Sequence, residues 1–429
     1  MVSAVLFITF FVLLVLNVPI SVCLGLSSAA AILYSGTSLT IVATNIYSGI
    51  SKFLLLAIPF FVLSGNIMAK AGISTRLIRF VDTCVGHRKG GIANVCIIVA
   101  CFFGAISGSG PATVAALGAV LIPAMIERGG FSAAFSTALM ATSSSIAIVI
   151  PPSIAFVVYA SITGVSIGDM FMAGIIPGIL MGLALVVVVM LEVRRNHVVP
   201  SNVEKASAKE RWNAFKDAFW GFLMPVIILG GIYSGLFTPT EAAAIAVFYG
   251  IIVSAFVYRN MGWKDFIHVL SASASSTASI LFLVANAHIF SYLLSSEQIP
   301  QKLAILMTSL TTNPTIIMFL IMIVLLIAGC FLDNAVAVIL LTPIFVNVVQ
   351  AMNIDICYFG VFLVFVLAIG QVTPPVGLCL FVACDIGKVS IEKVSREVLP
   401  YVGGLIVTAI LLVLFPQIVT WLPSLTKMA

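Results

Sequence analysis

Long apolar segments separated by short polar ones make up the chain. Continuous apolar runs of about 18 residues or more recur along the whole sequence, which is the length that an α-helix needs to cross a hydrocarbon core about 30 Å thick. Apolar and polar residues do not alternate within these runs, so the strands of a closed barrel are not expected. Because backbone groups in lipid must satisfy one another, the pattern predicts an all-α, polytopic membrane protein.

One clearly polar stretch, residues 194–217, divides the chain into halves of similar length. We therefore expect a first repeat over 1–193, a cytoplasmic linker over 194–217 and a second repeat over 218–429. A nearly constant shift between the halves aligns the prolines Pro123 with Pro343, Pro151 with Pro374, Pro152 with Pro375 and Pro177 with Pro400. The matches are few, and the shared order of apolar segments and breaks is the stronger evidence for a repeat.

Each half contains an apolar unit that is interrupted by a polar break. Ile92 to Ile106 would form a helix only about 22 Å long at 1.5 Å per residue, and it ends at the polar segment Ser107–Thr113. Basic residues flank the unit at Arg88, Lys89 and Arg128, which predicts a re-entrant hairpin that enters and leaves on one side. Two short crossings joined by an exposed loop are the alternative. The expected ranges are hairpins at about 90–127 and 314–350, and broken helices at about 133–160 and 356–384.

The basic residues predict the topology. Composition is 62% hydrophobic and 8% charged with a net charge of +5, against about 25% charged residues in soluble domains. The basic residues are scattered singly, which disfavours nucleic-acid binding. With both termini in the periplasm and inverted repeats, every Lys and Arg except Lys52, Lys302 and Lys427 falls in the cytoplasm, as the positive-inside rule requires. Ser74–Cys84 and Glu297–Leu310 are expected to be interfacial arms, and Met1–Leu16 a first membrane helix rather than a cleaved signal.

Asp333 is the most informative single residue. It is the only charged residue between Leu303 and Ile354, and a carboxylate at that depth costs a few kcal/mol unless something compensates it. A bound cation compensates it directly. Asp333 followed by Asn334 is also good N-cap chemistry, and the two roles are compatible.

Three further polar segments are candidates for ligand binding. The first tip contains hydroxyls, and glycines that let the backbone approach a ligand. The helix that follows Pro111 favours a substrate carboxylate at its N-terminus. A packing turn is the alternative. The two Pro-Pro breaks free carbonyl oxygens. The predicted Na⁺ ligands are Ser107, Gly108, Ser109, Thr113, Ser143, Ser144, Ser145, Asp333, Asn334, Gln371 and Thr373. The predicted substrate contacts are Ser107, Gly110, Pro111, Pro151, Pro152, Asn334, Pro374 and Pro375.

Other residues are better explained by structure. Thr238-Pro239-Thr240-Glu241 predicts a capping box, and His288 a packing residue. The eight cysteines lack metal-ligand spacing and are expected to be buried hydrophobes, so no transition metal and no organic cofactor is predicted. No phosphate-binding loop is present. A serine hydrolase at Ser107 with His268 or His288 is a distant possibility, so no enzymatic activity is expected.

These segments also carry a resemblance. Gly104 to Val114, Ile150-Pro-Pro-Ser, Phe237-Thr-Pro-Thr-Glu-Ala, Leu332-Asp-Asn and Gln371-Val-Thr-Pro-Pro-Val-Gly resemble the large membrane subunit (DctM/SiaM type) of tripartite ATP-independent periplasmic (TRAP) transporters, most nearly its sialic-acid type. The resemblance covers essentially the whole chain. It implies an elevator-type transporter of the ion-transporter superfamily, with two inverted repeats that each hold a re-entrant hairpin and a discontinuous helix.

The resemblance also implies function and partners. We expect Na⁺-driven uptake of an organic acid, with sialic acid favoured over a C4-dicarboxylate, across the bacterial inner membrane. The partners would be a small membrane subunit (DctQ/SiaQ type) and a periplasmic binding protein (DctP/SiaP type). The Na⁺ sites would pair the Ser107–Thr113 tip with the Ser143–Pro152 break, and Asp333–Asn334 with Gln371–Pro375. A stand-alone Na⁺/carboxylate symporter and a passive channel are the alternatives.

Overall fold

The computed structural model describes residues 1–88, 90–195 and 205–427, and these residues form helices and short connections only. The first half consists of α1 (Val2–Val15), α2 (Ile20–Tyr34), α3 (Thr40–Ile50), η1 (Phe53–Leu56), α4 (Ala57–Lys70), α5 (Ile73–Val85), α6 (Gly91–Ser107), α7 (Gly110–Glu127), α8 (Ala133–Ser144), α9 (Ile146–Val149), α10 (Ile154–Thr163) and α11 (Ile167–Arg195).

The second half begins with two helices, α12 and α13, that pack on each other. The helices that follow correspond to those of the first half. It consists of α12 (Ala208–Tyr233), α13 (Pro239–Ile252), η2 (Val253–Val257), α14 (Trp263–Ser296), α15 (Ile299–Leu310), α16 (Pro314–Phe331), α17 (Asn334–Ala351), α18 (Ile356–Gly370), α19 (Leu378–Gly387), α20 (Ile391–Leu414) and α21 (Gln417–Lys427). Ten stretches of the described chain are long and apolar enough to cross a membrane. The predicted all-α polytopic fold is confirmed.

Equivalent helices of the two halves run in opposite directions. The helix before the first arm, α4, packs along α14, the helix before the second arm. Asn66 Nδ2 donates to Ser273 Oγ at 2.8 Å, and Lys70 Nζ lies 2.9 Å from Asp265 Oδ1. As residue numbers rise along α4, those of its partners on α14 fall, so the two helices are antiparallel, as inverted repeats require.

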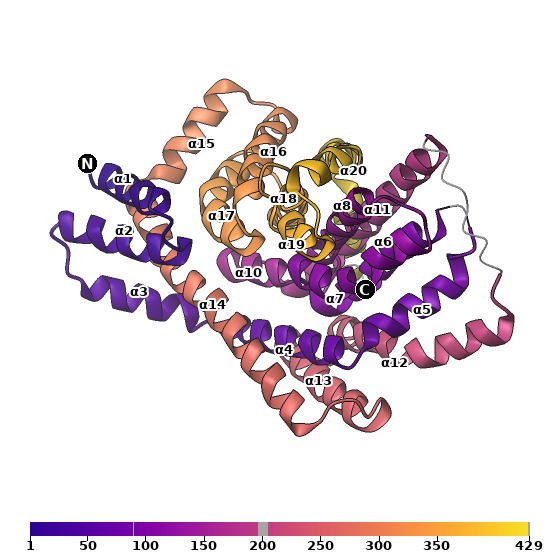
Figure 1. The fold of residues 1–429 in the computed structure, drawn as a ribbon. Coiled ribbons are helices and arrows are strands. Elements are labelled where there is room, and N and C mark those ends of the chain that lie inside the picture. Colours follow the sequence, from indigo (N-terminus) through magenta and orange to yellow (C-terminus); the bar gives the residue numbers. More distant parts are fainter. Residues whose placement is uncertain (89, 196–204, 428–429) are drawn as a thin grey trace.

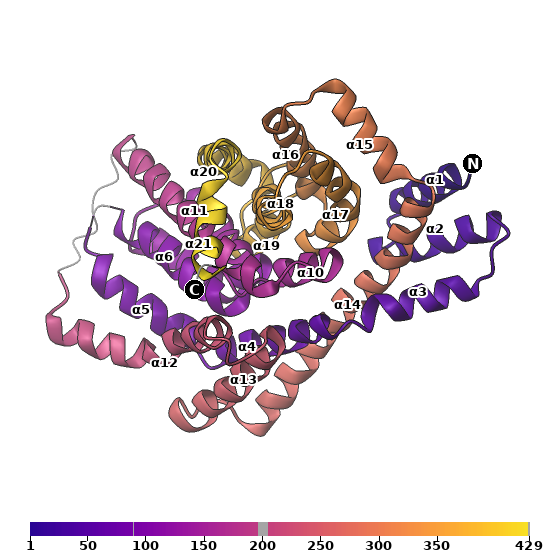
Figure 2. The same cartoon turned by 180° about the vertical axis from the view of Figure 1, so that it is seen from behind.

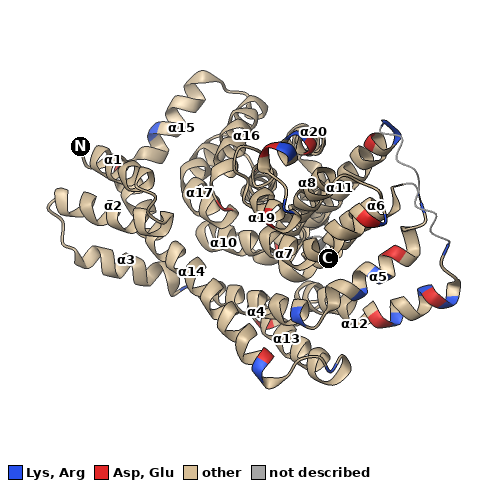
Figure 3. Cartoon of the chain, in the orientation of Figure 1, with Lys and Arg blue, Asp and Glu red and all other residues tan. Residues whose placement is uncertain are grey.

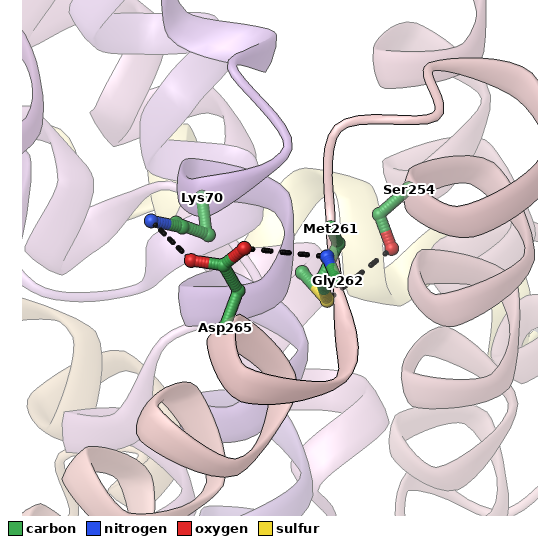
Figure 4. Close-up of polar contacts among 5 residues, drawn as sticks. All are labelled: Lys70, Ser254, Met261, Gly262 and Asp265. Carbon is green, nitrogen blue, oxygen red and sulfur yellow. Dashed lines mark hydrogen bonds and ion pairs between the residues drawn. The ribbon is translucent and has the colours of Figure 1, made fainter.

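The end of this helix pair is held by local polar contacts. Figure 4 shows Asp265 between Lys70 and the backbone N–H of Gly262, which donates to Asp265 Oδ2 at 3.2 Å. Beside it, Ser254 Oγ approaches Met261 Sδ at 3.7 Å. These contacts fix the turn that leads from η2 into α14.

The two broken helices are also antiparallel. Tyr159 Oη, near the end of α10, donates to the carbonyl of Ile356 at the start of α18, at 2.8 Å. At the other end of the pair, Gly387 at the end of α19 packs against Thr137 near the start of α8, so closely that a Cβ would overlap the threonine hydroxyl. The two breaks are thereby brought side by side in the middle of the molecule.

A close glycine contact sets the second hairpin against the second broken helix. Cβ atoms built at Gly329 and Gly370 would come within 3.0 Å of the opposing backbone. Small residues allow such approach of helix backbones in membranes. The contact places the tip of the α16–α17 hairpin beside the break that follows α18, and the N–H of Gly377 donates to the carbonyl of Cys330 at 3.0 Å.

Figures 1 and 2 show the hairpins and broken helices gathered together, with α14 crossing the molecule beside them and α1–α3 beyond it. Helix α14 has 34 residues, about 51 Å at 1.5 Å per residue. It contacts α2, α3, α4 and α17 along this length. One helix therefore borders both the peripheral helices and the central group.

Charged residues gather along α5 and α12 and at the outer ends of α11 and α14, whereas α1–α3 carry none (Figure 3). The end of the predicted linker needs correction, because α12 begins at Ala208 and continues past residue 217. Ser207 and Glu210 form a capping box there, so these polar residues begin a helix. Lys89, Glu204 and the rest of 196–204 lie outside the described residues. The side of the membrane on which each terminus lies stays a prediction.

Candidate functional site

The tip of the first hairpin is a tight turn between α6 and α7. Gly108 ends α6 with φ 62°, and Ser109 is extended and precedes α7. Beneath this turn Ser107 Oγ and Thr113 Oγ1 are 2.8 Å apart, and Thr113 donates to the carbonyl of Ser109 at 2.8 Å. A Cβ at Gly108 would lie 2.5 Å from the carbonyl oxygen of Pro152. Only glycine lets this tip rest on the first Pro-Pro break.

The tip of the second hairpin holds Asp333 between α16 and α17. One carboxylate oxygen accepts the N–H of Ala335 at 2.9 Å, so the predicted N-cap is confirmed. The other accepts Gln371 Nε2 from the second break at 3.2 Å. Asp333 therefore joins the second hairpin to the second broken helix, and it lies at a cavity rather than on an exposed loop.

Asn334 follows Asp333 and is 5% exposed. Neither its amide nitrogen nor its amide oxygen has a hydrogen-bond partner in the described protein. A buried amide left in this condition costs about 1–3 kcal/mol. The side chain is therefore free to bind a polar ligand.

The two breaks differ in the surroundings of their backbone carbonyl oxygens. Pro151-Pro152 and Pro374-Pro375 are both cis. Ser153 Oγ donates to the carbonyl of Ile148 across the first break at 2.5 Å. At the second break a Cβ on Gly377 would stand 2.9 Å from the carbonyl oxygen of Gln371 and 3.1 Å from that of Thr373. The unwound segment thus brings two carbonyl oxygens together.

A cavity of about 290 Å³ joins both tips and both breaks. The first tip, the second tip and the flanks of the breaks all contribute, together with two residues of α14. The lining residues are Gly108, Ser109, Gly110, Pro111, Ile148, Ile154, Ala155, Ser276, Ile280, Asp333, Asn334, Ala335, Gln371 and Leu378. Segments far apart in sequence thus line one cavity.

Seven of the predicted residues line this cavity: Gly108, Ser109, Gly110, Pro111, Asp333, Asn334 and Gln371. Ser107 and Thr113 lie directly beneath the first tip. Pro152 is buried under Gly108, and Pro151 faces a separate apolar cavity of about 560 Å³ between α6, α11 and α12. These four residues support the site without lining it.

The remaining predicted residues do not line the cavity. Ser143, Ser144 and Ser145 are fully buried, and the hydroxyls of Ser144 and Ser145 donate to carbonyls one turn back, at 2.6 and 2.7 Å. Thr373 Oγ1 donates to the carbonyl of Ile369 at 2.8 Å. Pro374 is half-buried and Pro375 exposed. In this conformation the hydroxyls of Ser144 and Ser145 bond to their own backbone, and that of Ser143 accepts the Cys96 thiol of α6.

Sequence reasoning missed the contribution of α14. Ser276 lies in a run of small and hydroxyl residues, 271–279, and Ile280 is the first of the apolar residues that follow. The pattern is compatible with any membrane helix and gives no sign of a site. Cys379 was likewise assigned a packing role only, yet its Sγ packs against Gly110 and lies 3.4 Å from Gln371 Oε1.

The electrostatics of the cavity are set by one carboxylate and several helix ends. Among its described lining residues Asp333 is the sole charged one. The N-termini of α7, α10, α17 and α19 all begin at or beside lining residues, and the positive ends of their helix dipoles favour anions. The cavity therefore combines a carboxylate, which attracts cations, with helix N-termini, which attract anions.

A smaller cavity of about 130 Å³ lies between α14 and the end of α10 and includes Lys52 and His288. Lys52 Nζ donates to the carbonyl of Ser161 at 2.6 Å, and burial lowers the pKa of its ammonium group. His288 packs against Gly49, as a packing residue should, but its Nδ1 has no hydrogen-bond partner in the described protein.

Of the structural explanations from the sequence, the capping box is confirmed, and the expectation that the cysteines are buried holds for four of the eight. Thr238 and Glu241 form the predicted capping box, with N–H to carboxylate and N–H to hydroxyl distances of 2.8 and 3.3 Å. All eight cysteines are free, four of them buried and four half-buried. The described residues that line the cavity at the first tip include neither His268 nor His288. His288 instead lines the smaller cavity beside Lys52.

Paired hairpins and broken helices around a cavity that holds a carboxylate are the architecture of a membrane transporter, because irregular backbone is tolerated at membrane depth only where it is buried in protein or lines a cavity. A family model described as "Tripartite ATP-independent periplasmic transporter, DctM component" matches residues 7–418. The chain belongs to this family.

Two relatives and one solved structure illustrate the similarity. The "C4-dicarboxylate TRAP transporter large permease protein DctM" of Pseudomonas aeruginosa is 41% identical, over 94% of this chain and 93% of the relative. The "Isethionate TRAP transporter permease protein DctMQ" of Oleidesulfovibrio alaskensis is 40% identical over 96% of this chain, which covers 65% of that protein. The crystal structure of the Alcanivorax borkumensis YdaH transporter aligns with a TM-score of 0.62 at 15% identity, covering 88% of each chain, and supports the fold alone.

Family membership settles the general role. The protein is the large permease subunit of a transporter rather than an enzyme, and it is a multi-span protein of the bacterial inner membrane. The tripartite family implies a second membrane subunit and a periplasmic binding protein as partners.

Proposed function

We propose that the protein carries out Na⁺-coupled secondary active uptake of an organic-acid anion, delivered by a periplasmic binding protein. The observation that carries the proposal is the cavity in which Asp333 stands beside the unpartnered amide of Asn334 and the N-terminus of α7. The cavity offers an organic acid no Lys or Arg among its described lining. Its only charge repels the substrate, so a cation is needed to reverse the local field.

Sodium suits the available ligands. Carboxylate, carbonyl and hydroxyl oxygens are hard ligands. The second tip offers the Asp333 carboxylate, and the second break, which is joined to it through Gln371 Nε2, offers the carbonyl oxygens of Gln371 and Thr373. One Na⁺ would lie between Asp333–Asn334 and Gln371–Pro375. A second would lie beneath Ser107–Thr113, facing the Ser143–Pro152 break, whose hydroxyls would have to turn from their present carbonyl partners.

The substrate would bind above these ions. Gly110 begins α7 and Asn334 begins α17, so the positive ends of the helix dipoles of both hairpins would favour an anion at the centre. Ion binding would neutralise Asp333 and make the cavity electropositive. Coupling then follows, because the acid binds well only after Na⁺.

The substrate within this class is a matter for transport assays. The sequence resemblance favours sialic acid, whereas the relatives described above are named for a C4-dicarboxylate and for isethionate. These acids share an anionic group and differ in size. The cavity of about 290 Å³ is just below the range of about 300–1,000 Å³ for small-molecule sites.

An elevator motion would carry the site across the membrane. The hairpins α6–α7 and α16–α17 and the broken helices form one packed body, joined by the Gly108–Pro152 and Gly329–Gly370 contacts. Helices α4 and α14 form a separate antiparallel pair along its edge. We assign the first group to the moving body and the pair to the scaffold.

The test is uptake by proteoliposomes that contain this subunit with its small membrane partner. N-acetylneuraminate, succinate and isethionate are supplied with and without a cognate binding protein and an inward Na⁺ gradient. The proposal requires accumulation of at least one acid that needs both the gradient and the binding protein. Accumulation without a binding protein would identify a stand-alone symporter instead. Downhill flux that ignores Na⁺ would identify a passive channel.

A further inference from the structure

Helix α14 contributes a wall to the cavity that is not part of either hairpin or broken helix. Ser276 and Ile280 both line it. They are four residues apart, so they lie on one face of the helix, one above the other. Ser276 is exposed and Ile280 is half-buried, which fits side chains that border an open cavity.

The neighbouring face of α14 is used for packing. Ser273 is 3% exposed and Thr277 is 8% exposed. Ser273 Oγ accepts Asn66 Nδ2 of α4 at 2.8 Å. Two faces of α14 thus have different roles. Ser273 and Thr277 lie on the buried face, where Ser273 bonds to α4, whereas Ser276 and Ile280 line the cavity.

Contacts along its length hold α14 in place. Lys70 and Asp265 pair near its start. Further along, Gly25 of α2 lies against Asn286 and Gly49 of α3 against His288, each so closely that a Cβ would meet the opposing side chain. These contacts set both the position and the rotation of α14, so its cavity-facing side chains are fixed independently of the hairpin tips.

We propose that Ser276 and Ile280 of α14 determine which organic acids the site accepts, by bounding the space for the part of the substrate that lies away from its carboxylate. The inference rests on the proposed function. The anionic group would be held by Asn334 and the helix N-termini on the opposite side. A wall of one hydroxyl and one branched alkyl side chain suits the uncharged carbon skeleton of an acid, and it limits its bulk.

The experiment measures a substrate profile rather than a single rate. The membrane complex with Ser276→Phe is reconstituted, and initial Na⁺-driven uptake of N-acetylneuraminate, succinate and isethionate is compared with wild type. Each acid is supplied with the binding protein at a saturating concentration, and each variant is compared with wild type for the same acid, so that the selectivity of delivery is the same on both sides and cancels. We expect the larger of the transported acids to lose uptake at least about tenfold more than the smaller, the scale at which a filled pocket discriminates.

Ser275→Phe is the matched control. Ser275 is exposed on a different face of α14, where Ser279 Oγ donates to its carbonyl at 3.0 Å, and it does not line the cavity. The same bulk at this position should leave the profile of the three acids unchanged. Both substitutions are at exposed positions, so assembly of the membrane complex, checked by gel filtration, should match wild type.

Ile280→Ala gives the opposite change. It removes bulk from the same wall and should raise uptake of the largest acid relative to the smallest. If the wild-type complex transports and the profiles of Ser276→Phe and Ile280→Ala both match wild type, the wall has no role in selectivity and the inference is wrong. If the wild-type complex accumulates none of the acids with Na⁺, the proposed function itself fails and the inference fails with it.

Discussion

At the scale of single residues, each carboxylate oxygen of Asp333 makes a different contact. One oxygen caps α17 through the N–H of Ala335, and the other reaches Gln371 at the second break. Asparagine retains an acceptor for the cap, since it is among the best N-cap residues, but it removes the charge. The substitution can therefore distinguish a structural carboxylate from an ion ligand.

We expect Asp333→Asn to raise the Na⁺ concentration for half-maximal uptake at least about tenfold, equivalent to about 1.4 kcal/mol of lost ion binding, with thermal stability close to wild type. Asp333→Ala should abolish Na⁺-dependent uptake. Uptake is measured against Na⁺ concentration in proteoliposomes. Asp355→Asn is the control, because Asp355 caps α18 through Tyr358 at 2.6 Å and does not line the site. If Asp333→Asn shows the Na⁺ dependence of wild type, the Asp333 charge does not bind the ion and the residue serves only as the N-cap of α17.

Gly108 allows a contact that no other residue type permits. Its φ is 62°, and a Cβ would lie 2.5 Å from the carbonyl oxygen of Pro152. Gly108→Ala should therefore displace the first tip and reduce uptake severely. Gly130→Ala provides the comparison, since its φ is 67° with nothing within 4 Å of a Cβ. That variant should show only the left-handed strain, about 1–2 kcal/mol of stability, with uptake retained; equal losses in both variants would mean that the Pro152 contact is unimportant.

At the scale of elements, α10 links the cavity to the peripheral helices. Its first residues, Ile154 and Ala155, line the cavity. In its last turn the carbonyl of Ser161 accepts the Lys52 ammonium at 2.6 Å. The last carbonyls of a helix have no partner within it, and a cation there is favourable. Lys52 precedes α4 in the chain and so connects the helices assigned to the scaffold with a helix that enters the site.

We expect Lys52→Met to lower the apparent melting temperature of the purified complex and to change the uptake rate, because it leaves the Ser161 carbonyl unpaired between the two bodies. The melting curve and the initial uptake rate are measured on the same preparation. Lys302→Met is the control: Lys302 makes the same kind of contact, to the carbonyl of Glu297 at 2.9 Å, but it is exposed and bonds within its own segment. Indistinguishable effects of the two substitutions would argue against a connection between bodies.

At the scale of the whole molecule, the inverted arrangement brings one carboxylate and two hairpin tips to a shared cavity, and transport there would move net charge. If the ions outnumber the charges of the acid, each net positive charge gains about 2.3 kcal/mol per 100 mV across the membrane. We expect uptake to rise when the liposome interior is made negative with a potassium diffusion potential, at constant Na⁺ gradient. Unchanged uptake would indicate electroneutral co-transport, in which the Na⁺ ions only balance the charge of the acid, and slower uptake would contradict an excess of Na⁺.

The sequence alone determined the class of fold, the positions of the two hairpins and two breaks, and the place of Asp333 at a tip. Hydropathy run length, Gly and Pro are local properties, and a lone carboxylate in an apolar run has few solutions in lipid. It did not determine which side chains face the cavity. Because lipid and protein interior are both apolar, a membrane helix has no solvent-facing stripe to reveal its rotation. Only the tertiary structure shows that Ser144 and Ser145 bond to their own backbone and that Ser276 and Ile280 of α14 line the site. The physical reason is that the rotation of each helix is set by its packing against segments far apart in the chain.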